Sequence, residues 1–172
     1  MARPVQLTSK EKATLHIKKA RNGKGIFAKV EFLPGATIYE VTGPFITCDV
    51  DEEIDEVVRD NAIRFSSKWY VSPEGKVGAI QNHSCNPNAK VMKKDKRLFV
   101  VALSHISRGE EVVIDYSTIV ARDDIWEMQC NCGEKNCRKV IGPFHKLPKK
   151  LKDAYVSLKA VPPYVYRKPI KG

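Results

Sequence analysis

No stretch of the sequence comes close to the roughly 18 consecutive apolar residues of a membrane-spanning helix. The first residues, MARPVQLTSKEK, have no apolar core like that of a secretory signal peptide. Internal repeats are absent, as is the strand–helix alternation that builds a doubly wound nucleotide-binding fold. These absences lead us to expect a soluble protein of cytoplasmic or nuclear type with no membrane partner. A signal for specialised secretion needs none of the features named above and is left open.

Acidic residues are in the minority, since 30 Lys and Arg against 20 Asp and Glu leave a net charge of +10. Residues 49–60 nevertheless hold seven acids and one Arg, whereas residues 145–172 hold eight Lys or Arg and one Asp. A basic segment attracts nucleic acid or other acidic partners, but an ordinary solvated surface has the same composition. Weak attraction of DNA by the basic tail is therefore one interpretation, and an ordinary solvated surface is the other.

Cysteine occurs five times, and three of these residues are close together in CNCGEKNC, which has the spacing C-x-C-x4-C. Cys130 and Cys132 are poorly placed to form a disulfide with each other, because a disulfide needs a particular separation and direction. Together with Cys137 their thiolates can share a soft metal ion, and a closed zinc site needs four ligands. The fourth must come from elsewhere, and Cys48 and Cys85 are the other thiols. Free thiols, or a disulfide in an exported protein, are the alternatives.

Short alternating segments between Gly and Pro turns predict a mainly β protein. Strands or hairpins are expected within residues 13–20, 26–32, 37–43, 68–80, 89–103 and 107–117. Helices are expected over residues 51–65, with a charged outer face, and over residues 120–128. A basic segment punctuated by Pro follows the cysteines.

Two glycines, Gly23 and Gly25, lie one residue apart between two predicted strands. No Gly-Lys-Ser/Thr follows them, so the segment is not a phosphate loop. Glycine lets the backbone approach a ligand closely, but a simple hairpin turn also explains the pair.

Four motifs follow one another along the chain: GKGIFA, NHSCNPN, GEEVVIDY and CNCGEKNC. In this order and at these separations they resemble the SET-domain protein-lysine methyltransferases with a post-SET cysteine cluster, in a compact form without a cysteine-rich pre-SET segment. The resemblance covers residues from about 12 to 145. It implies a mainly β fold with several short sheets around a pseudoknot, few short helices and a zinc-bound post-SET loop.

The same resemblance divides the chain into three parts. A SET domain is expected at residues 12–120, with an insert at about 45–66, followed by a post-SET zinc-binding segment at 121–145 and a basic C-terminal tail at 146–172.

The resemblance implies that S-adenosylmethionine is the cofactor and that it sits where two chain segments cross. Asn82 and His83 would contact it, with the His83 backbone bonding to adenine. Gly23, Lys24 and Gly25 would line the methionine end.

It also implies the remaining site residues. Tyr116 would be the catalytic residue, a phenol that aligns the lysine amine without acting as a strong base, and Phe144 would close over adenine and the lysine channel. The implied zinc ligands are Cys85, Cys130, Cys132 and Cys137. This choice selects Cys85 over Cys48.

The sequence departs from the family at the lysine channel. Val41 stands where many members have a tyrosine, and Ala79 and Ile80 fall in a frame where many have Arg-Phe, so a contact to the cofactor carboxylate is expected from another residue such as Lys24. Ile114 takes a position where tyrosine favours one methylation and phenylalanine allows more. Val41 and Ile114 both remove hydroxyls and enlarge the channel, which predicts that di- or trimethylation can occur.

The expected function is S-adenosylmethionine-dependent methylation of a lysine in a protein substrate, with histone, ribosomal and chromatin-like proteins all open. The acidic residues 49–60 are expected to dock a basic segment around that lysine, unless they are an ordinary solvated helix face. A catalytically weak, zinc-stapled protein-interaction module and a nucleic-acid binder are the rival classes. The oligomeric state is left open.

Overall fold

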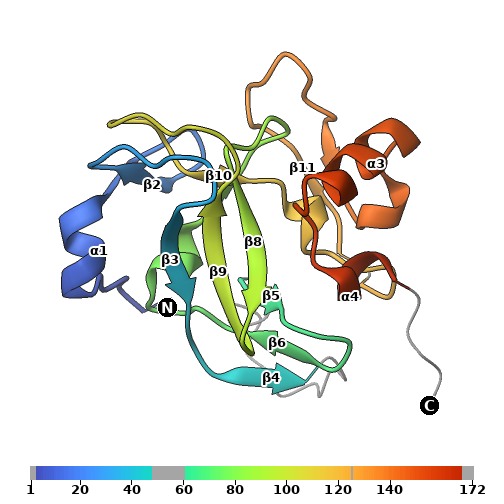
Figure 1. Cartoon of the computed structure of the whole chain (residues 1–172), viewed down its shortest axis with the longest axis horizontal. Coiled ribbons are helices and arrows are strands. Elements are labelled where there is room, and N and C mark those ends of the chain that lie inside the picture. The colour runs from blue at the N-terminus through green and yellow to red at the C-terminus, as the bar shows by residue number, and fades with distance from the viewer. Residues whose placement is uncertain (1–2, 48–60, 125, 168–172) are drawn as a thin grey trace.

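The structure is a computed structural model that describes residues 3–47, 61–124 and 126–167. Its strands form several small sheets, and short helices lie at opposite sides of them (Figure 1). This mainly β architecture confirms the fold class predicted from the sequence. None of the helices in the described ranges is long and apolar enough to cross a bilayer.

The central sheet has the order β3–β9–β8, with β3 at Thr37–Val41, β9 at Arg97–Ala102 and β8 at Ala89–Lys94. β8 and β9 form the hairpin predicted from their alternation, in full register from Ala89 opposite Ala102 to Lys94 opposite Arg97. Asp95 and Lys96 make the tight turn with φ of 48° and 58°. Aspartate tolerates this left-handed region better than most residues, which suits it to the turn.

The other antiparallel sheets are smaller. β1 (Leu15–Lys19) pairs with β2 (Lys24–Ala28), so Gly23 and Gly25 lie at the turn of a hairpin and at its first pairs. β6 (Trp69–Val71) lies between β4 (Phe45–Thr47) and β5 (Ile63–Arg64). The last pair is β11 (Met128–Gln129) with β12 (Val140–Ile141).

One pair of strands is parallel and brings distant segments together. β7 (Asn82–His83) runs beside β10 (Val113–Ile114), with Asn82 opposite Val113 and His83 opposite Ile114. Two 3-10 turns flank this pair, η1 (Val77–Ile80) before β7 and η2 (Tyr116–Thr118) after β10. The sequence motifs NHSCNPN and GEEVVIDY thus meet at one point of the fold.

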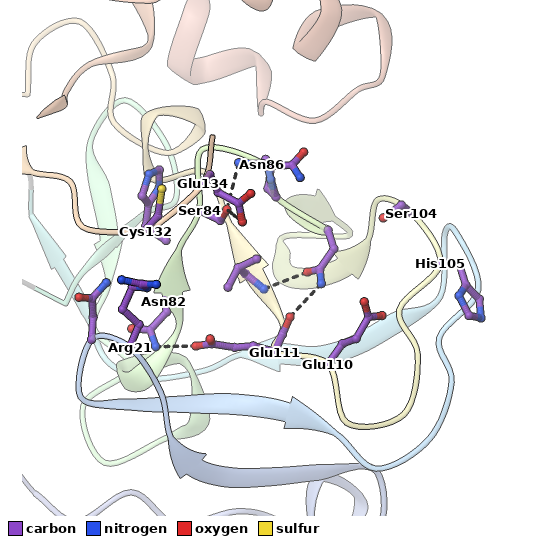
Figure 2. Close-up of a pocket in the computed structure, with 15 residues that line it drawn as sticks. Arg21, Asn82, Ser84, Asn86, Ser104, His105, Glu110, Glu111, Cys132 and Glu134 are labelled. Carbon is purple, nitrogen blue, oxygen red and sulfur yellow. Dashed lines mark hydrogen bonds between the residues drawn. The ribbon is translucent and has the colours of Figure 1, made fainter. Parts of the chain in front are cut away.

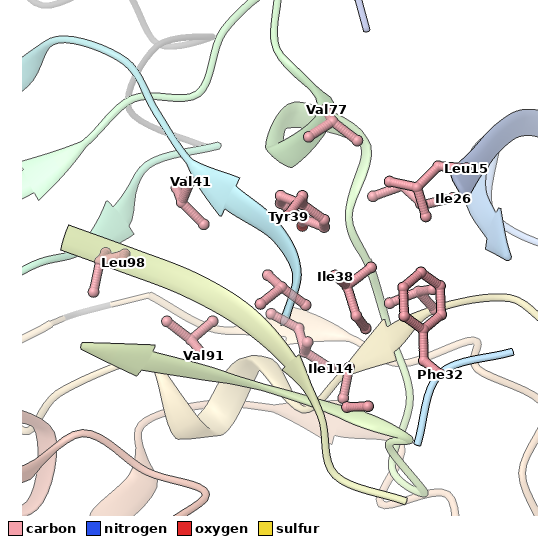
Figure 3. Close-up of a cluster of buried hydrophobic side chains, with 14 of the residues drawn as sticks. Leu15, Ile26, Phe32, Ile38, Tyr39, Val41, Val77, Val91, Leu98 and Ile114 are labelled. Carbon is pink, nitrogen blue, oxygen red and sulfur yellow. The ribbon is translucent and has the colours of Figure 1, made fainter. Parts of the chain in front are cut away.

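The main hydrophobic core lies between the central sheet, the β1–β2 hairpin and β10 (Figure 3). Each of these elements contributes side chains that are almost completely buried, including Leu15, Ile26, Ile38, Val91, Leu98 and Ile114. Their alternation along the strands produces one apolar face per strand, as expected for a sheet covered on that side.

Two local predictions are wrong. Residues Val77–Ile80 form a 3-10 turn instead of the second strand of a hairpin. Residues 120–128 were expected to be helical, but their described part contains turns and the start of β11. The reason is a long-range one: Asp123 and Asp124 both bind the buried guanidinium of Arg64, at 2.8 Å and 2.6 Å, which holds the segment against β5.

The predicted helix at 51–65 lies mostly outside the described residues, as does the acidic segment 49–60. Its last residues, Ile63–Arg64, form strand β5 instead of a helical end. Ile63 pairs with Val71, and buried Ile63 adds to the main core, so sheet pairing determines the conformation here.

The basic C-terminal segment contains structure that the sequence pattern did not predict. α3 (Lys149–Ser157) and α4 (Pro163–Tyr166) pack with η3 (Phe144–Lys146) on the side of the molecule opposite α1 (Ser9–Thr14) (Figure 1). They enclose a second apolar cluster made of Phe144, Leu147, Tyr155, Ala160, Val161 and Val165. Pro163 is the first residue of α4, where its fixed φ favours a helical start.

Candidate functional site

A polar pocket of about 420 Å³ opens beside the crossing of β7 and β10 (Figure 2). Asn82, His83 and Ser84 of the NHSCNPN motif line it, as do Cys132 and Glu134 of the CNCGEKNC motif. Its remaining lining comes from the turn before β2, from the loop after Ser84, from the segment that precedes β10 and from Val113 of β10 itself. The pocket is therefore built where all four sequence motifs come near one another.

Gly25 does not line the pocket itself but packs against two residues that do, Asn82 and Glu111. Asn82 Nδ2 donates to the backbone oxygen of Lys24 at 3.0 Å and to Glu111 Oε1 at 2.7 Å, directly over Gly25. A Cβ added at Gly25 would overlap Glu111 Oε1 and would lie 2.9 Å from Ala20 Cβ and 3.0 Å from Asn82 Nδ2. The second glycine of the pair is thus required by close packing, and not only by a turn.

We predict that Gly25→Ala weakens ligand binding in this pocket and lowers stability by about 1–3 kcal/mol, because the added methyl must displace the Asn82–Glu111 hydrogen bond. Isothermal titration with S-adenosylhomocysteine and thermal unfolding measure the two effects. Gly35→Ala is the matched control: Gly35 has φ +87° with nothing within 4 Å of an added Cβ. It should lose stability through backbone strain but bind normally. Normal binding by Gly25→Ala would contradict the prediction.

The NHSCNPN segment supplies the hydrogen bonds that hold the crossing together. Asn88 Nδ2 donates to the backbone oxygen of Glu111 at 2.8 Å, and Asn88 Oδ1 accepts from the backbone nitrogen of Val113 at 2.9 Å. Ser84 N donates to the backbone oxygen of Ile114 at 2.9 Å. Buried backbone groups of two threaded segments need such partners, which explains the density of polar residues in the motif.

His83 connects the crossing to Tyr116. The backbone nitrogen of Tyr116 donates to His83 Nδ1 at 3.1 Å, and the two rings are 5.3 Å apart. Burial lowers the pKa of His83 to about 4, against the opposing charge of Asp115. The ring is thus neutral at physiological pH, so the approach of its Nδ1 to Asp115 Oδ1 at 3.6 Å is not an ion pair.

Tyr116 presents a protonated phenol. Its hydroxyl donates to the backbone oxygen of Gln81, just before Asn82. Burial, assisted by the Glu111 carboxylate, raises the pKa of Tyr116 well above its usual value of 10. The ring also lies 6.1 Å from the Trp126 ring. A phenol in this setting donates or accepts hydrogen bonds but does not serve as a strong base at neutral pH.

The thiols gather beside the pocket, and one of them, Cys132, also lines it. Cys85 Sγ and Cys130 Sγ are 3.7 Å apart, close to the roughly 3.8 Å expected between two ligands 2.3 Å from a tetrahedral zinc ion. His83, Cys85, Cys130 and Cys132 place ligand atoms within 4.8 Å of one another, and the side chain of Cys137 interacts with Cys130 and Cys132. Donors of this softness and spacing fit zinc.

This group includes His83 and leaves out Cys137, the remaining ligand predicted from the sequence, whose Sγ lies 3.6 Å from the backbone oxygen of Cys130. His83 Nε2 is 3.4 Å from Cys85 Sγ. Because His83 Nδ1 accepts the hydrogen bond from Tyr116, the proton of the neutral ring belongs on Nε2. A protonated nitrogen cannot ligate a metal, so this tautomer makes His83 a hydrogen-bond donor to the Cys85 sulfur.

Other predicted site residues lie apart from the pocket. Phe144 is buried in the C-terminal apolar cluster, 6.2 Å from the Tyr166 ring, and does not line the pocket. Val41 and Ile114 belong to the main core. Gly23, Lys24 and Gly25 belong to the β1–β2 hairpin and do not line the pocket. Cys48 lies outside the described residues.

The sequence reasoning missed two residues at the site. Arg21 lines the pocket and packs on Gly133, where an added Cβ would lie 2.7 Å from the Arg21 guanidinium carbon. Trp126 lies against Tyr116 and the thiols. The signal for Arg21 was its place two residues before the first glycine of the pair, whereas nothing local to the sequence marks Trp126.

Comparison with known proteins identifies the family. The SET domain family model matches residues 23–117, more than half of the 172 residues. The chain is 30% identical over 138 residues to a "Histone-lysine N-methyltransferase, H3 lysine-36 specific" of Yarrowia lipolytica and 34% identical over 140 residues to the protein so named in Candida albicans. These alignments cover 73% and 70% of this chain. This chain belongs to the SET-domain family.

The curated relatives are much longer proteins, since the matched parts are 18% and 15% of their lengths. Among solved structures, the crystal structure of KRYPTONITE in complex with mCHH DNA, H3(1-15) peptide and SAH aligns with a TM-score of 0.58 and 20% identity. That alignment covers 74% of this chain and 29% of the other. It supports the fold.

Proposed function

We propose that this protein transfers the methyl group of S-adenosylmethionine to the side chain of a lysine in a protein substrate. The observation that carries the proposal is the crossing of β7 and β10, where His83 lines the polar pocket and its ring lies 5.3 Å from the ring of the partly buried Tyr116. The named relatives are histone-lysine N-methyltransferases, which supports the same activity.

The charges of the pocket suit this cofactor. S-adenosylmethionine carries a sulfonium and an ammonium but a single carboxylate, and the pocket is lined by Glu110, Glu111 and Glu134 with Arg21 as its one described cation. We propose that Asn82 and His83 contact the cofactor, and that Arg21 binds its carboxylate, because Arg21 lines the pocket and Lys24 does not. An arginine is well suited to bidentate carboxylate binding.

The role proposed for Tyr116 follows from its protonated hydroxyl. A lysine amine attacks the methyl carbon only after losing its proton, and free lysine has a pKa of about 10.4. A dry channel and the neighbouring sulfonium both disfavour the ammonium and so promote that loss. The Tyr116 oxygen, already donating its proton to Gln81, accepts a hydrogen bond from the amine and turns the nitrogen lone pair toward the methyl group.

Zinc has a structural part in this proposal. Cys85 is in the NHSCNPN motif and the other proposed ligands, Cys130, Cys132 and Cys137, are in the post-SET segment, so one ion would join the two. When bound it supplies no chemistry to the reaction. Because Cys132 is one of the proposed ligands, the ion would hold Cys132 and the nearby Glu134 where they line the pocket.

We further propose the division into a SET domain at 12–120 with an insert at about 45–66, a post-SET segment at 121–145 and a basic tail that includes α3 and α4. Histone or chromatin-like proteins are the proposed substrates, in a nuclear or cytoplasmic location, because the relatives are named for histone lysines. The acidic residues 49–60 remain the proposed dock for a basic peptide.

The test is transfer of a labelled methyl group from S-adenosylmethionine to histones and to a mixed protein extract, followed by mass spectrometry of the modified lysines. Labelled lysine that disappears with the Tyr116→Phe variant supports the proposal. A zinc-stapled interaction module would bind proteins but label none of them, and that outcome would replace the enzyme with the module.

The number of methyl groups added is a separate prediction. The resemblance assigns Ile114 and Val41 to the lysine channel, and the structure buries both in the main core beside the crossing. Neither carries a hydroxyl that could anchor a water beside the amine, so we expect di- or trimethyl-lysine under excess cofactor. Ile114 is fully buried, and a tyrosine there must find new space at a cost of about 1–3 kcal/mol, but its hydroxyl should shift the product toward monomethyl-lysine. Ile114→Phe controls for ring size. Monomethyl-lysine alone from the unmodified protein would contradict the prediction.

A further inference from the structure

Asp115 is a buried carboxylate that the proposed reaction does not use directly. The residue is 1% exposed. Its Oδ1 accepts hydrogen bonds from Arg138 Nη2 at 2.7 Å and from the backbone nitrogen of Ser117 at 3.0 Å, and its Oδ2 accepts one from the Tyr155 hydroxyl at 2.7 Å. A buried anion is tolerated only when its oxygens are bonded in this way.

The three donors come from three separate parts of the chain. Ser117 is in η2, directly after Tyr116, and Arg138 directly follows the thiol of Cys137. Tyr155 is in α3, 40 residues beyond Asp115. The segment matched by the SET domain family model ends at residue 117, so the two side-chain donors lie outside it. Asp115 is therefore the point at which the SET domain, the cysteine segment and the C-terminal helix meet.

Asp115 also determines the backbone turn that carries Tyr116. Its backbone oxygen accepts from the nitrogen of Thr118 at 2.9 Å and from Thr118 Oγ1 at 2.7 Å, while its carboxylate caps Ser117. Asp115 is thus the N-cap of η2, and these bonds fix the start of the turn. The direction of the Tyr116 side chain therefore depends on where the Asp115 carboxylate is held.

Two neighbours hold that carboxylate, and they differ in what fixes them. Arg138 is tied to the thiols, because its backbone nitrogen donates to Cys85 Sγ at 3.4 Å. Its Nε is buried without a partner among the described residues, so the guanidinium relies on Asp115 and on a longer contact to Ser117. Tyr155 is fixed independently, because its ring is buried in the C-terminal apolar cluster and only its hydroxyl reaches Asp115.

We propose that Tyr155 is a positioning residue for the active site, acting through Asp115 on the turn that aims Tyr116. The inference rests on the function proposed above, because it assigns the C-terminal helix to the same reaction. Without the Tyr155 hydroxyl, Asp115 Oδ2 has no described partner, and the carboxylate can turn away from the geometry that closes η2. The basic C-terminal segment then belongs to the catalytic unit and is more than a tail that attracts acidic partners.

The test compares two tyrosines of the C-terminal segment. Tyr155→Phe removes the hydroxyl on Asp115 and keeps the ring that packs in the apolar cluster. Tyr164→Phe is the matched control, because the Tyr164 hydroxyl donates to the backbone oxygen of Arg64 at 2.8 Å and not to Asp115. We expect Tyr155→Phe to lower kcat about tenfold with KM changed less than about twofold, the pattern of a residue that matters for alignment. Tyr164→Phe should keep the kcat of the unmodified protein.

Coupling and amide exchange complete the test. If Tyr155 acts through Asp115, Tyr155→Phe combined with Asp115→Asn should lose no more kcat than Asp115→Asn alone. Hydrogen exchange of the amides at residues 114–118 should be faster in Tyr155→Phe than in Tyr164→Phe, with both variants similar in thermal unfolding.

The exchange measurement does not depend on activity, so it also decides the case in which the unmodified protein transfers no methyl group and the proposed function fails. Equal kcat in the two tyrosine variants would overturn the positioning role. So would equal exchange at 114–118, or a loss of kcat that follows thermal stability in both variants.

Discussion

We expect Tyr116→Phe to lower the turnover of methyl transfer by about a hundredfold or more while leaving cofactor affinity within about threefold, since a preorganised polar group at the reacting atoms acts mainly in the transition state. The ring should stay in place, because it packs beside the rings of His83 and Trp126. What is lost is the hydroxyl oxygen that the Gln81 backbone orients. Single-turnover kinetics and titration with S-adenosylhomocysteine measure the two quantities.

The pH dependence separates alignment from base catalysis. Burial raises the pKa of Tyr116, so its phenol stays protonated at the pH where the enzyme would be assayed. The activity of the unmodified protein should therefore rise with pH as the substrate lysine loses its proton, and Tyr116→Phe should show the same rise at a lower rate. Tyr39→Phe is a useful control, because that buried hydroxyl donates to Gln81 Oε1 at 2.8 Å instead of to its backbone. Wild-type turnover in Tyr116→Phe would refute the alignment role.

Local pattern was enough to predict the hairpins. β1–β2 and β8–β9 are continuous in sequence, alternate with period two and turn at Gly23 or at Asp95–Lys96, so each signal lies within one stretch of chain. The crossing has no such signal. β7 and β10 are two residues each, and Asn82 pairs with Val113 across 30 intervening residues, so only resemblance to a known family predicted it.

The errors have a common physical origin in long-range partners. Residues 120–128 have helical spacing, but Arg64 binds Asp123 and Asp124 across the chain. In the C-terminal segment, prolines were taken as punctuation of a tail, yet Pro163 begins α4 and buried Tyr155 anchors α3. Asp115 was part of a motif, but its partners Arg138 and Tyr155 could not be predicted from spacing.

Removal of the metal should have the second large effect. It should disrupt the pocket before it unfolds the hydrophobic core. The four cysteines proposed as ligands lie outside the main hydrophobic core, and one of them, Cys132, lines the pocket together with Glu134. Chelation, or Cys85→Ser, should therefore lower affinity for S-adenosylhomocysteine by about tenfold or more while most of the β structure persists. Structural zinc sites contribute on the order of 10 kcal/mol to the folding of the loops they close, so the post-SET segment should lose its order without the ion.

The choice of ligands can be separated from the presence of metal. Elemental analysis of the reduced protein should give one zinc per chain, and Cys85→Ser and Cys137→Ser should both lose it. Cys48→Ser is the matched control and should keep full zinc content, because the resemblance assigns no ligand role to that thiol. His83→Gln should keep the metal as well, because the hydrogen bond that Tyr116 donates to Nδ1 leaves His83 Nε2 protonated and unable to coordinate. Retention of zinc in Cys137→Ser with loss in His83→Gln would instead make the site three cysteines and one histidine, and would tie the metal directly to the ring that lies beside Tyr116.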